Sequence, residues 1–268
     1  MDGQGSSAKD EGPGGPAAGA RHAWRRRRSF MAEYVVVVAG VLTALAAEQV
    51  VQRLHWQWLV RDAERAIRKD LSLTADIASE RVAIGRCLDA RLTLLRRRVE
   101  GAPEALSTPL PAHADGFPMA YAYRAPSRAW NAEVWDGALA DGTWRRLKRE
   151  RARSMNLLYL TVRSSREANH QEKAESSDLE VLGQADIPLS ADKRIELLQH
   201  IERLQRLNGE LTSLSRQILR RIDDLGYLPS LADTERRLAG PYSRAMSCRF
   251  APEDLKTRVL DGWFTLNR

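Results

Sequence analysis

Hydrophobic residues recur along most of the chain at helical spacing, and prolines and glycines separate the resulting segments. Between Ser29 and about Glu100 there is no proline, and apolar residues return every three or four positions. This period is typical of an amphipathic helix with one face against a partner. We predict one very long helix here, with an apolar stripe made of Leu54, Ala63, Ile67, Leu71, Ile77, Ile84, Leu88, Leu92, Leu95 and Val99.

Proline and glycine then interrupt the pattern. The segment from Gly101 to Pro126 holds five prolines and two glycines, so it should end the long helix and form an irregular connection. Ser127 is expected to cap the next helix, which bears Trp130 and Trp135. The chain from Thr143 to about Leu182 is again free of proline, and its apolar spacing predicts a further helix.

The clearest heptad pattern follows Ser190, which is expected to be the N-cap of a long helix. Asn208 and Ser215 interrupt its seam. Either they are buried polar groups that fix the register, or they are partly exposed at the edge of a bundle. Ser230 with Asp233 predicts a capped start for a short helix. The seam consists of Leu197, Ile201, Leu204, Asn208, Leu211, Ser215, Ile218, Ile222 and Leu225.

An apolar run near the N-terminus is the most informative segment for localisation. Tyr34 to Ala47 is free of charge for 14 residues, about 21 Å as a helix, whereas Phe30 to Val51 reaches about 33 Å. The longer span crosses the roughly 30 Å hydrocarbon core of a bilayer. We therefore predict a retained membrane anchor. A cleaved export signal is the alternative, because Ala44-Leu45-Ala46 supplies a small-x-small site.

Residues at both ends of this run predict its orientation. Trp24, Trp56 and Trp58 are expected at the membrane interfaces, although Trp56 and Trp58 could instead be core residues of the next helix. By the positive-inside rule, the cluster before the run places the N-terminus in the cytoplasm and the bulk of the chain outside. The same cluster can hold anionic lipid headgroups. It consists of Arg25, Arg26, Arg27 and Arg28.

Glu48 and Gln49 are polar residues close to the exit of the run. Their side chains either reach the headgroup layer or form a hydrogen bond across a pair of helices in the membrane. The second interpretation predicts self-association through this segment.

The chain has two cysteines, Cys87 and Cys248, and neither belongs to a Cys-x-x-Cys pair. If the bulk of the chain is exported, a disulfide between them is permitted, and we predict that they are bonded. Two buried free thiols are the alternative. The segment from Tyr242 to Arg268 is expected to form an extended piece followed by a final helix on the bundle.

Charge and motifs exclude several functional classes. The net charge is +7, but acidic residues are interleaved with the arginines and no basic-aromatic motif occurs, so nucleic-acid binding is not predicted. The five histidines are far apart in sequence, and none forms a metal-binding pair. No nucleophile motif or phosphate-binding loop is present. We predict no catalytic, cofactor or metal site and no enzymatic activity, and the sequence identifies no small-molecule substrate.

The N-terminal third resembles a loose group of uncharacterised bacterial single-pass inner-membrane proteins. The shared pattern is a basic stretch, then Ser29-Phe30 and Glu33, then the segment from Gly40 to Leu45, Glu48-Gln49 and the aromatic exit from His55 to Trp58. The resemblance covers about the first hundred residues. It implies an N-terminal anchor with an exported helical domain and no particular activity.

These patterns together predict an all-α protein with three parts. Residues 1–28 form a disordered basic cytoplasmic tail, residues 29–54 a transmembrane helix continuous with a long helix, and residues 55–268 an antiparallel periplasmic helical bundle. The predicted function is that of a structural or interaction protein of the cell envelope. Its expected partners are membrane lipid and either a second copy of the chain or another envelope protein. The alternative is a periplasmic sensor or ligand-binding bundle that acts through a partner membrane protein.

Overall fold

The computed structural model describes residues 17–102, 104–106, 122–183, 187–238 and 248, with only the backbone described for residues 17–32 and for Ile187. Residues 1–16 of the predicted tail (residues 1–28) and nearly all of the segment from Tyr242 to Arg268 therefore lie outside the description. The chain divides into two units, Met1–Trp58 and Leu59–Arg268.

The described residues form an all-α fold with five α-helices, so the predicted fold class is confirmed at this level. Two short 3₁₀ helices, η1 and η2, and two strands of two residues connect the helices. The elements are α1 (Ala17–Gly101), β1 (Ala105–Leu106), α2 (Glu133–Ala140), η1 (Thr143–Arg146), α3 (Arg149–Ser177), η2 (Glu180–Gly183), β2 (Ile187–Pro188), α4 (Ala191–Asp224) and α5 (Leu231–Leu238).

The long first helix extends further than predicted. It begins at Ala17 rather than near Ser29, so residues 17–28, which were predicted to belong to a disordered tail, are helical. Alanine and arginine are both strong helix formers, and these two residue types dominate this stretch. The prediction of disorder rested on the glycine, serine and proline residues of positions 1–16, and it was extended to residue 28.

The prediction that Ser127 caps a helix is wrong. Residues 124–132 have no regular secondary structure, and α2 begins only at Glu133. Side chains from α3 bind the carbonyls of this segment, with Arg166 donating to Trp130 O at 2.6 Å and Asn169 to Pro126 O at 3.2 Å. Because these backbone groups find partners on another helix, the local preference for a helix is overridden.

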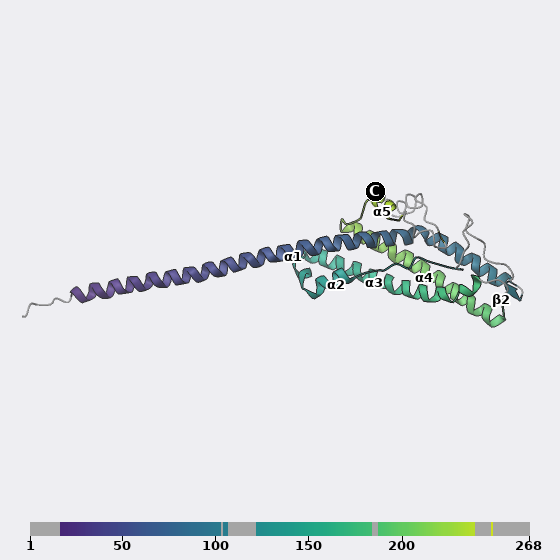
Figure 1. The fold of residues 1–268 in the computed structure, drawn as a ribbon, viewed down its shortest axis with the longest axis horizontal. Coiled ribbons are helices and arrows are strands. Elements are labelled where there is room, and N and C mark those ends of the chain that lie inside the picture. Colours follow the sequence, from purple (N-terminus) through teal and green to yellow (C-terminus); the bar gives the residue numbers. More distant parts are fainter. Residues whose placement is uncertain (1–16, 103, 107–121, 184–186, 239–247, 249–268) are drawn as a thin grey trace, which may run out of the picture. The chain divides into compact units, whose positions relative to one another are not determined.

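Three helices of the second unit lie side by side as a bundle (Figure 1), with α1 packing against α3 and α4. Tyr159 bonds Asp70, and further along both helices Glu172 bonds Arg81, so α3 runs parallel to α1. By contrast α4 is antiparallel to both, since its start bonds the end of α1 through Arg194 and Val99. The predicted antiparallel arrangement is thus correct for α4 and wrong for the α1–α3 pair.

The parallel pair requires a long connection, which residues 102–148 provide. The two small strands lie at the end of the bundle where α1 ends and α4 begins. There β1 pairs antiparallel with β2, with Ala105 opposite Pro188 and Leu106 opposite Ile187. The sequence did not predict this sheet, because each strand is too short to show a period.

The predicted starts of two helices are confirmed. Ser190 is the N-cap of α4 and accepts a hydrogen bond from the backbone of Lys193 at 3.2 Å. At the start of α5 the backbone N–H of Asp233 donates to Ser230 Oγ at 3.2 Å, as in a capping box, and the Ser230 hydroxyl donates to Asp233 Oδ2 at 2.6 Å. The predicted seam of α4 is also confirmed, since all its members are buried except Leu225, which is partly buried.

The apolar core of the second unit consists of two main clusters. One contains Ile67 and Leu71 of α1 with Trp135 and Tyr159, whose rings stack 5.7 Å apart. The other includes Leu88 and Leu92 of α1. Along α1, Val82 is the last member of the first cluster and Ile84 opens the second. The boundary between the clusters is therefore at the middle of the bundle.

Candidate functional site

Four polar side chains meet at the boundary between the two apolar clusters. The guanidinium of Arg81 donates to both carboxylate oxygens of Glu172, at 2.7 and 2.6 Å, and to Asn208 Oδ1 at 2.9 Å. Tyr123 donates its hydroxyl to Glu172 Oε1 at 2.8 Å. The side chains of Arg81 and Glu172 are 4% and 2% exposed, so the pair is cut off from solvent. We call Arg81, Tyr123, Glu172 and Asn208 the polar layer.

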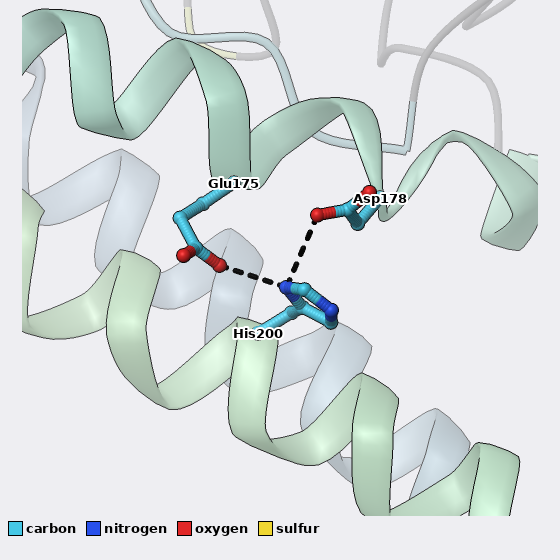
Figure 2. A group of neighbouring side chains, drawn as sticks. All are labelled: Glu175, Asp178 and His200. Atoms are coloured by element: carbon cyan, nitrogen blue, oxygen red, sulfur yellow. Dashed lines mark hydrogen bonds and ion pairs between the residues drawn. The ribbon is translucent and has the colours of Figure 1, made fainter.

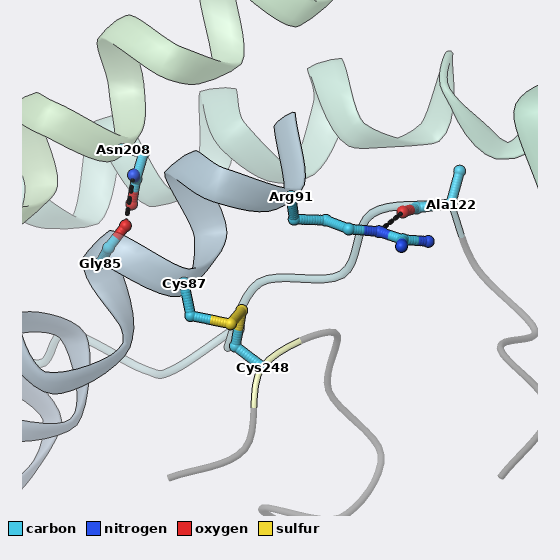
Figure 3. Close-up of a disulfide and its surroundings, with 6 residues drawn as sticks. All are labelled: Gly85, Cys87, Arg91, Ala122, Asn208 and Cys248. Carbon is cyan, nitrogen blue, oxygen red and sulfur yellow. Dashed lines mark hydrogen bonds between the residues drawn. A yellow bond between two sulfur atoms is a disulfide. The ribbon is translucent and has the colours of Figure 1, made fainter. Parts of the chain in front are cut away.

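The polar layer joins all three long helices and the connection before α2. Asn208 also donates from Nδ2 to the carbonyl of Gly85 at 2.9 Å, as Figure 3 shows, so α4 is bound to the backbone of α1. Asn208 is 4% exposed. Of the two interpretations of this seam residue, the buried one is therefore correct. A buried amide with fixed partners specifies which turn of α4 faces which turn of α1.

Burial and charge hold Arg81 and Tyr123 each in one protonation state. Burial alone lowers the pKa of Arg81, but the charge and hydrogen bonds of Glu172 outweigh it, so this pKa lies above its ordinary value. Burial, followed by the neighbouring Glu172, raises the pKa of Tyr123 well above its ordinary value. Neither group exchanges a proton near neutral pH. The arrangement therefore suits the positioning of helices rather than acid-base catalysis.

Close packing of α1 and α4 beside the polar layer leads to a testable prediction. A Cβ at Gly85 would lie 2.6 Å from Thr212 Oγ1. We expect Gly85→Ala to lower the free energy of unfolding by about 1–2 kcal/mol, since overpacking outweighs the gain in helix propensity. Urea unfolding of the detergent-solubilised protein measures this.

The matched control is Gly209→Ala on α4, where nothing lies within 4 Å of the added methyl group. This change should stabilise the helix by up to about 1 kcal/mol. Thr212→Ala should restore stability to the Gly85→Ala protein. Equal effects of the two glycine substitutions would contradict the close approach of α1 and α4.

The disulfide predicted between Cys87 and Cys248 is present in the structure. The two Cα atoms are 5.8 Å apart and the residues are separated by 161 positions in the sequence. One turn further along α1, Arg91 donates from Nε to the carbonyl of Ala122 at 3.0 Å (Figure 3). One turn of α1 thus holds two distant parts of the chain. Disulfides form and persist in oxidising compartments, so this one indicates a location outside the cytoplasm.

A second group of titratable side chains joins the C-terminal part of α3 to the N-terminal part of α4. As Figure 2 shows, Glu175 and Asp178 both approach Nδ1 of His200, at 2.7 and 3.4 Å. These three residues have the composition of a metal site. However, Arg203 donates from Nε to the same Glu175 oxygen at 2.9 Å and lies 3.0 Å from His200 Nδ1. A guanidinium in that position would repel a cation, so the donor set does not fit a metal ion.

This group therefore forms an ion-pair network. Burial raises the pKa of Glu175, but hydrogen bonds from Arg203 and His200 outweigh it, and the pKa lies below its ordinary value. The carboxylate is ionised at neutral pH and holds the end of α3 against α4. His200 was considered in the sequence only for metal-binding motifs; its partners on α3 come from the fold.

The apolar run is exposed along the first part of α1. Tyr34, Val36 and Leu42 are 60%, 70% and 61% exposed, values that describe isolated helix rather than core. Among the described residues, α1 is the one helix long and apolar enough to cross a membrane, and none of its apolar stretch is buried. Length and composition alone give this result, and an N-terminal signal sequence would give it too. An apolar surface of this length requires a partner or a lipid environment.

Trp58 is 67% exposed and Trp56 is partly exposed, so neither side chain belongs to the buried core of the described residues. Glu48 accepts a hydrogen bond from Gln52 at 3.3 Å along its own helix. The predicted contact of Glu48 and Gln49 across two helices is not tested by a single chain. The side chains of Trp24 and of the arginine cluster, residues 25–28, lie outside the description.

A cleft of about 390 Å³ lies beside α1. Its walls come from α1, from the segment before α2 and from α5. Two ion pairs cross it: Arg128 donates to both oxygens of Glu80 at 2.7 Å, and Arg237 to both oxygens of Asp76 at 2.5 and 3.0 Å. The first pair attaches the segment before α2 to α1, and the second attaches α5 to α1.

Comparison of the chain with protein-family models, curated proteins and solved structures finds no match. The function is therefore argued from the chain's own residues.

Sequence reasoning missed the polar layer, although a signal was present. Arg81 lies at core spacing between Ile77 and Ile84 in the apolar stripe of α1. In α3 the buried positions continue from Val162 to Glu172 in the same period, although the residues become polar. Charged residues that hold core positions on two helices indicate a buried ion pair. The cleft had no such signal, because its walls come from three distant segments.

Proposed function

We propose that the chain is a single-pass inner-membrane protein of the cell envelope, with a structural or interaction role. Its N-terminus lies in the cytoplasm, and the disulfide-bonded bundle lies in the periplasm. The observation that carries this proposal is the exposed apolar surface of α1 before Leu59, since none of the apolar stretch of this helix is buried. The arginine cluster supports the orientation through the positive-inside rule.

Two further observations support the interaction role. The disulfide between Cys87 and Cys248 suits the periplasm. The polar groups of the bundle's interior are used to bind helices to one another, as in the polar layer. Glu48 and Gln49 offer a contact for a second copy of the chain within the membrane.

Membrane retention tests the anchor. We expect the full chain to remain in the membrane fraction after an alkaline carbonate wash. Val41→Arg with Leu42→Arg should release a large share of it, because each arginine near the bilayer centre costs about 2.5–3.5 kcal/mol. Leu157→Arg with Leu160→Arg on α3 is the control, since both leucines are exposed on the bundle and their substitution should leave retention unchanged.

A cleaved export signal would give a different result. The protein would then be recovered from the soluble periplasmic fraction, and an N-terminal epitope tag would be lost. That outcome would contradict the anchor while leaving the bundle itself unaffected.

A ligand-binding role is the second candidate, and the cleft on α1 is the observation that favours it. Ligand sites in proteins commonly have volumes of roughly 300–1,000 Å³, and about 390 Å³ falls in this range.

A further inference from the structure

The charged groups of the cleft do not balance. Its lining contains three carboxylates, Asp70, Asp76 and Glu80, and two guanidiniums, Arg128 and Arg237. The arithmetic gives a net charge of −1 when all five are ionised. Asp76 and Glu80 are each matched by an arginine in a two-bond pair. Asp70 is the remaining charge, and it has no basic partner within salt-bridge distance among the described residues.

The surroundings of Asp70 leave its carboxylate in need of a cation. Among the described residues, the hydroxyl of Tyr159 donates a hydrogen bond to Asp70 Oδ2 at 2.8 Å. Burial, opposed by this hydrogen bond and reinforced by the charge of Glu133, raises the pKa of Asp70 above its ordinary value. The second oxygen, Oδ1, accepts no hydrogen bond from the described part of the chain and is available to a ligand that donates hydrogen bonds.

Apolar side chains follow Asp70 on the same face of α1. Leu73 lies three residues further along the helix and Ile77 one turn beyond it, and both line the cleft. Leu73 is 53% exposed, so its side chain offers apolar surface to a ligand in the cleft. An aliphatic group of a ligand would cover this surface, at a distance from Asp70 that a short side chain spans.

We propose that this cleft binds a small organic cation, a protonated primary amine whose ammonium group lies on Asp70 and whose aliphatic body covers Leu73 and Ile77. The inference goes beyond the anchoring role and does not depend on it. A metal ion is disfavoured, because two of the three carboxylates are already occupied by arginines. An organic anion would add to the negative charge of the cleft.

Titration calorimetry of the full chain in detergent tests this proposal, with 3-methylbutylamine as the probe. The matched compound is 3-methylbutan-1-ol, which has the same aliphatic body without the charge and also corrects for partition into micelles. We expect saturable binding of the amine at one site per chain and binding of the alcohol at least tenfold weaker, since a hydrogen bond between charged groups is lost.

Variants locate the site. Asp70→Asn keeps an oxygen acceptor for Tyr159 and should weaken amine binding by about tenfold or more. The control Asp89→Asn removes an exposed carboxylate from α1 outside the cleft and should change binding less than twofold. Leu73→Lys changes an exposed position and places an ammonium group near Asp70, so it should compete with the probe even if Asp70→Asn fails to fold. Equal binding of amine and alcohol, or undiminished binding to either cleft variant, would overturn the proposal.

Discussion

Replacing Glu172 with alanine is expected to lower the free energy of unfolding by about 3–5 kcal/mol, because it leaves the Arg81 guanidinium buried without a counter-charge. The carboxylate accepts three hydrogen bonds, two from Arg81 and one from Tyr123. In the variant Tyr123 loses this acceptor, and Arg81 keeps only its bond to Asn208 and no negative charge beside it, while both side chains are almost fully buried. Urea unfolding of the detergent-solubilised chain, followed by circular dichroism, measures the loss.

Asp136→Ala is the matched control. Asp136 also pairs with an arginine, Arg163, but the two side chains are 51% and 36% exposed. Exposed pairs contribute roughly 0–1 kcal/mol, so this change should have little effect. If Glu172→Ala destabilised the protein no more than Asp136→Ala, the polar layer would not be the buried pair that we describe.

Removal of the disulfide has the other large expected effect. In the chain-entropy model, a cross-link across 161 residues stabilises the folded state by on the order of 5 kcal/mol, mainly by restricting the unfolded chain. Replacing Cys87 and Cys248 with serine should therefore shift the urea midpoint strongly downward. Dithiothreitol should shift the natural chain in the same direction.

The double serine variant supplies its own control, because the reductant should not change its unfolding. Non-reducing gel electrophoresis provides a second readout: Cys87→Ala should change the mobility of protein isolated from cells. If the reductant altered neither the unfolding nor the mobility of the natural chain, the cysteines would not be bonded in the cell.

Periodicity predicted the parts of the fold that depend on local pattern. The seam of α4 and the stripe of α1 recur over many turns, and the caps at Ser190 and Ser230 are local hydrogen bonds, so all of them are visible in the sequence. The segment after Pro126 was predicted wrongly because its backbone partners, Arg166 and Asn169, lie on α3. Contacts of that kind are set by tertiary structure and leave no local signal.

The candidate site divides in the same manner. The anchor and the cysteine pair follow from composition, length and count. The polar layer brings together residues 81, 123, 172 and 208, and the cleft combines α1 with residues that precede α2 and form α5. Which charged residue meets which depends on helix order and direction. The parallel arrangement of α1 and α3, which the sequence did not predict, brings Glu172 to Arg81 and Tyr159 to Asp70.

The central claim is that α1 anchors the chain in the inner membrane with the bundle on the periplasmic side. Two reporters fused in turn after Arg268 test it most directly: alkaline phosphatase, which is active only when exported, and green fluorescent protein, which fluoresces only in the cytoplasm when export follows the general secretory route. The account predicts an active phosphatase fusion and a dark fluorescent fusion. A fluorescent fusion with an inactive phosphatase would place the bundle in the cytoplasm and contradict the account.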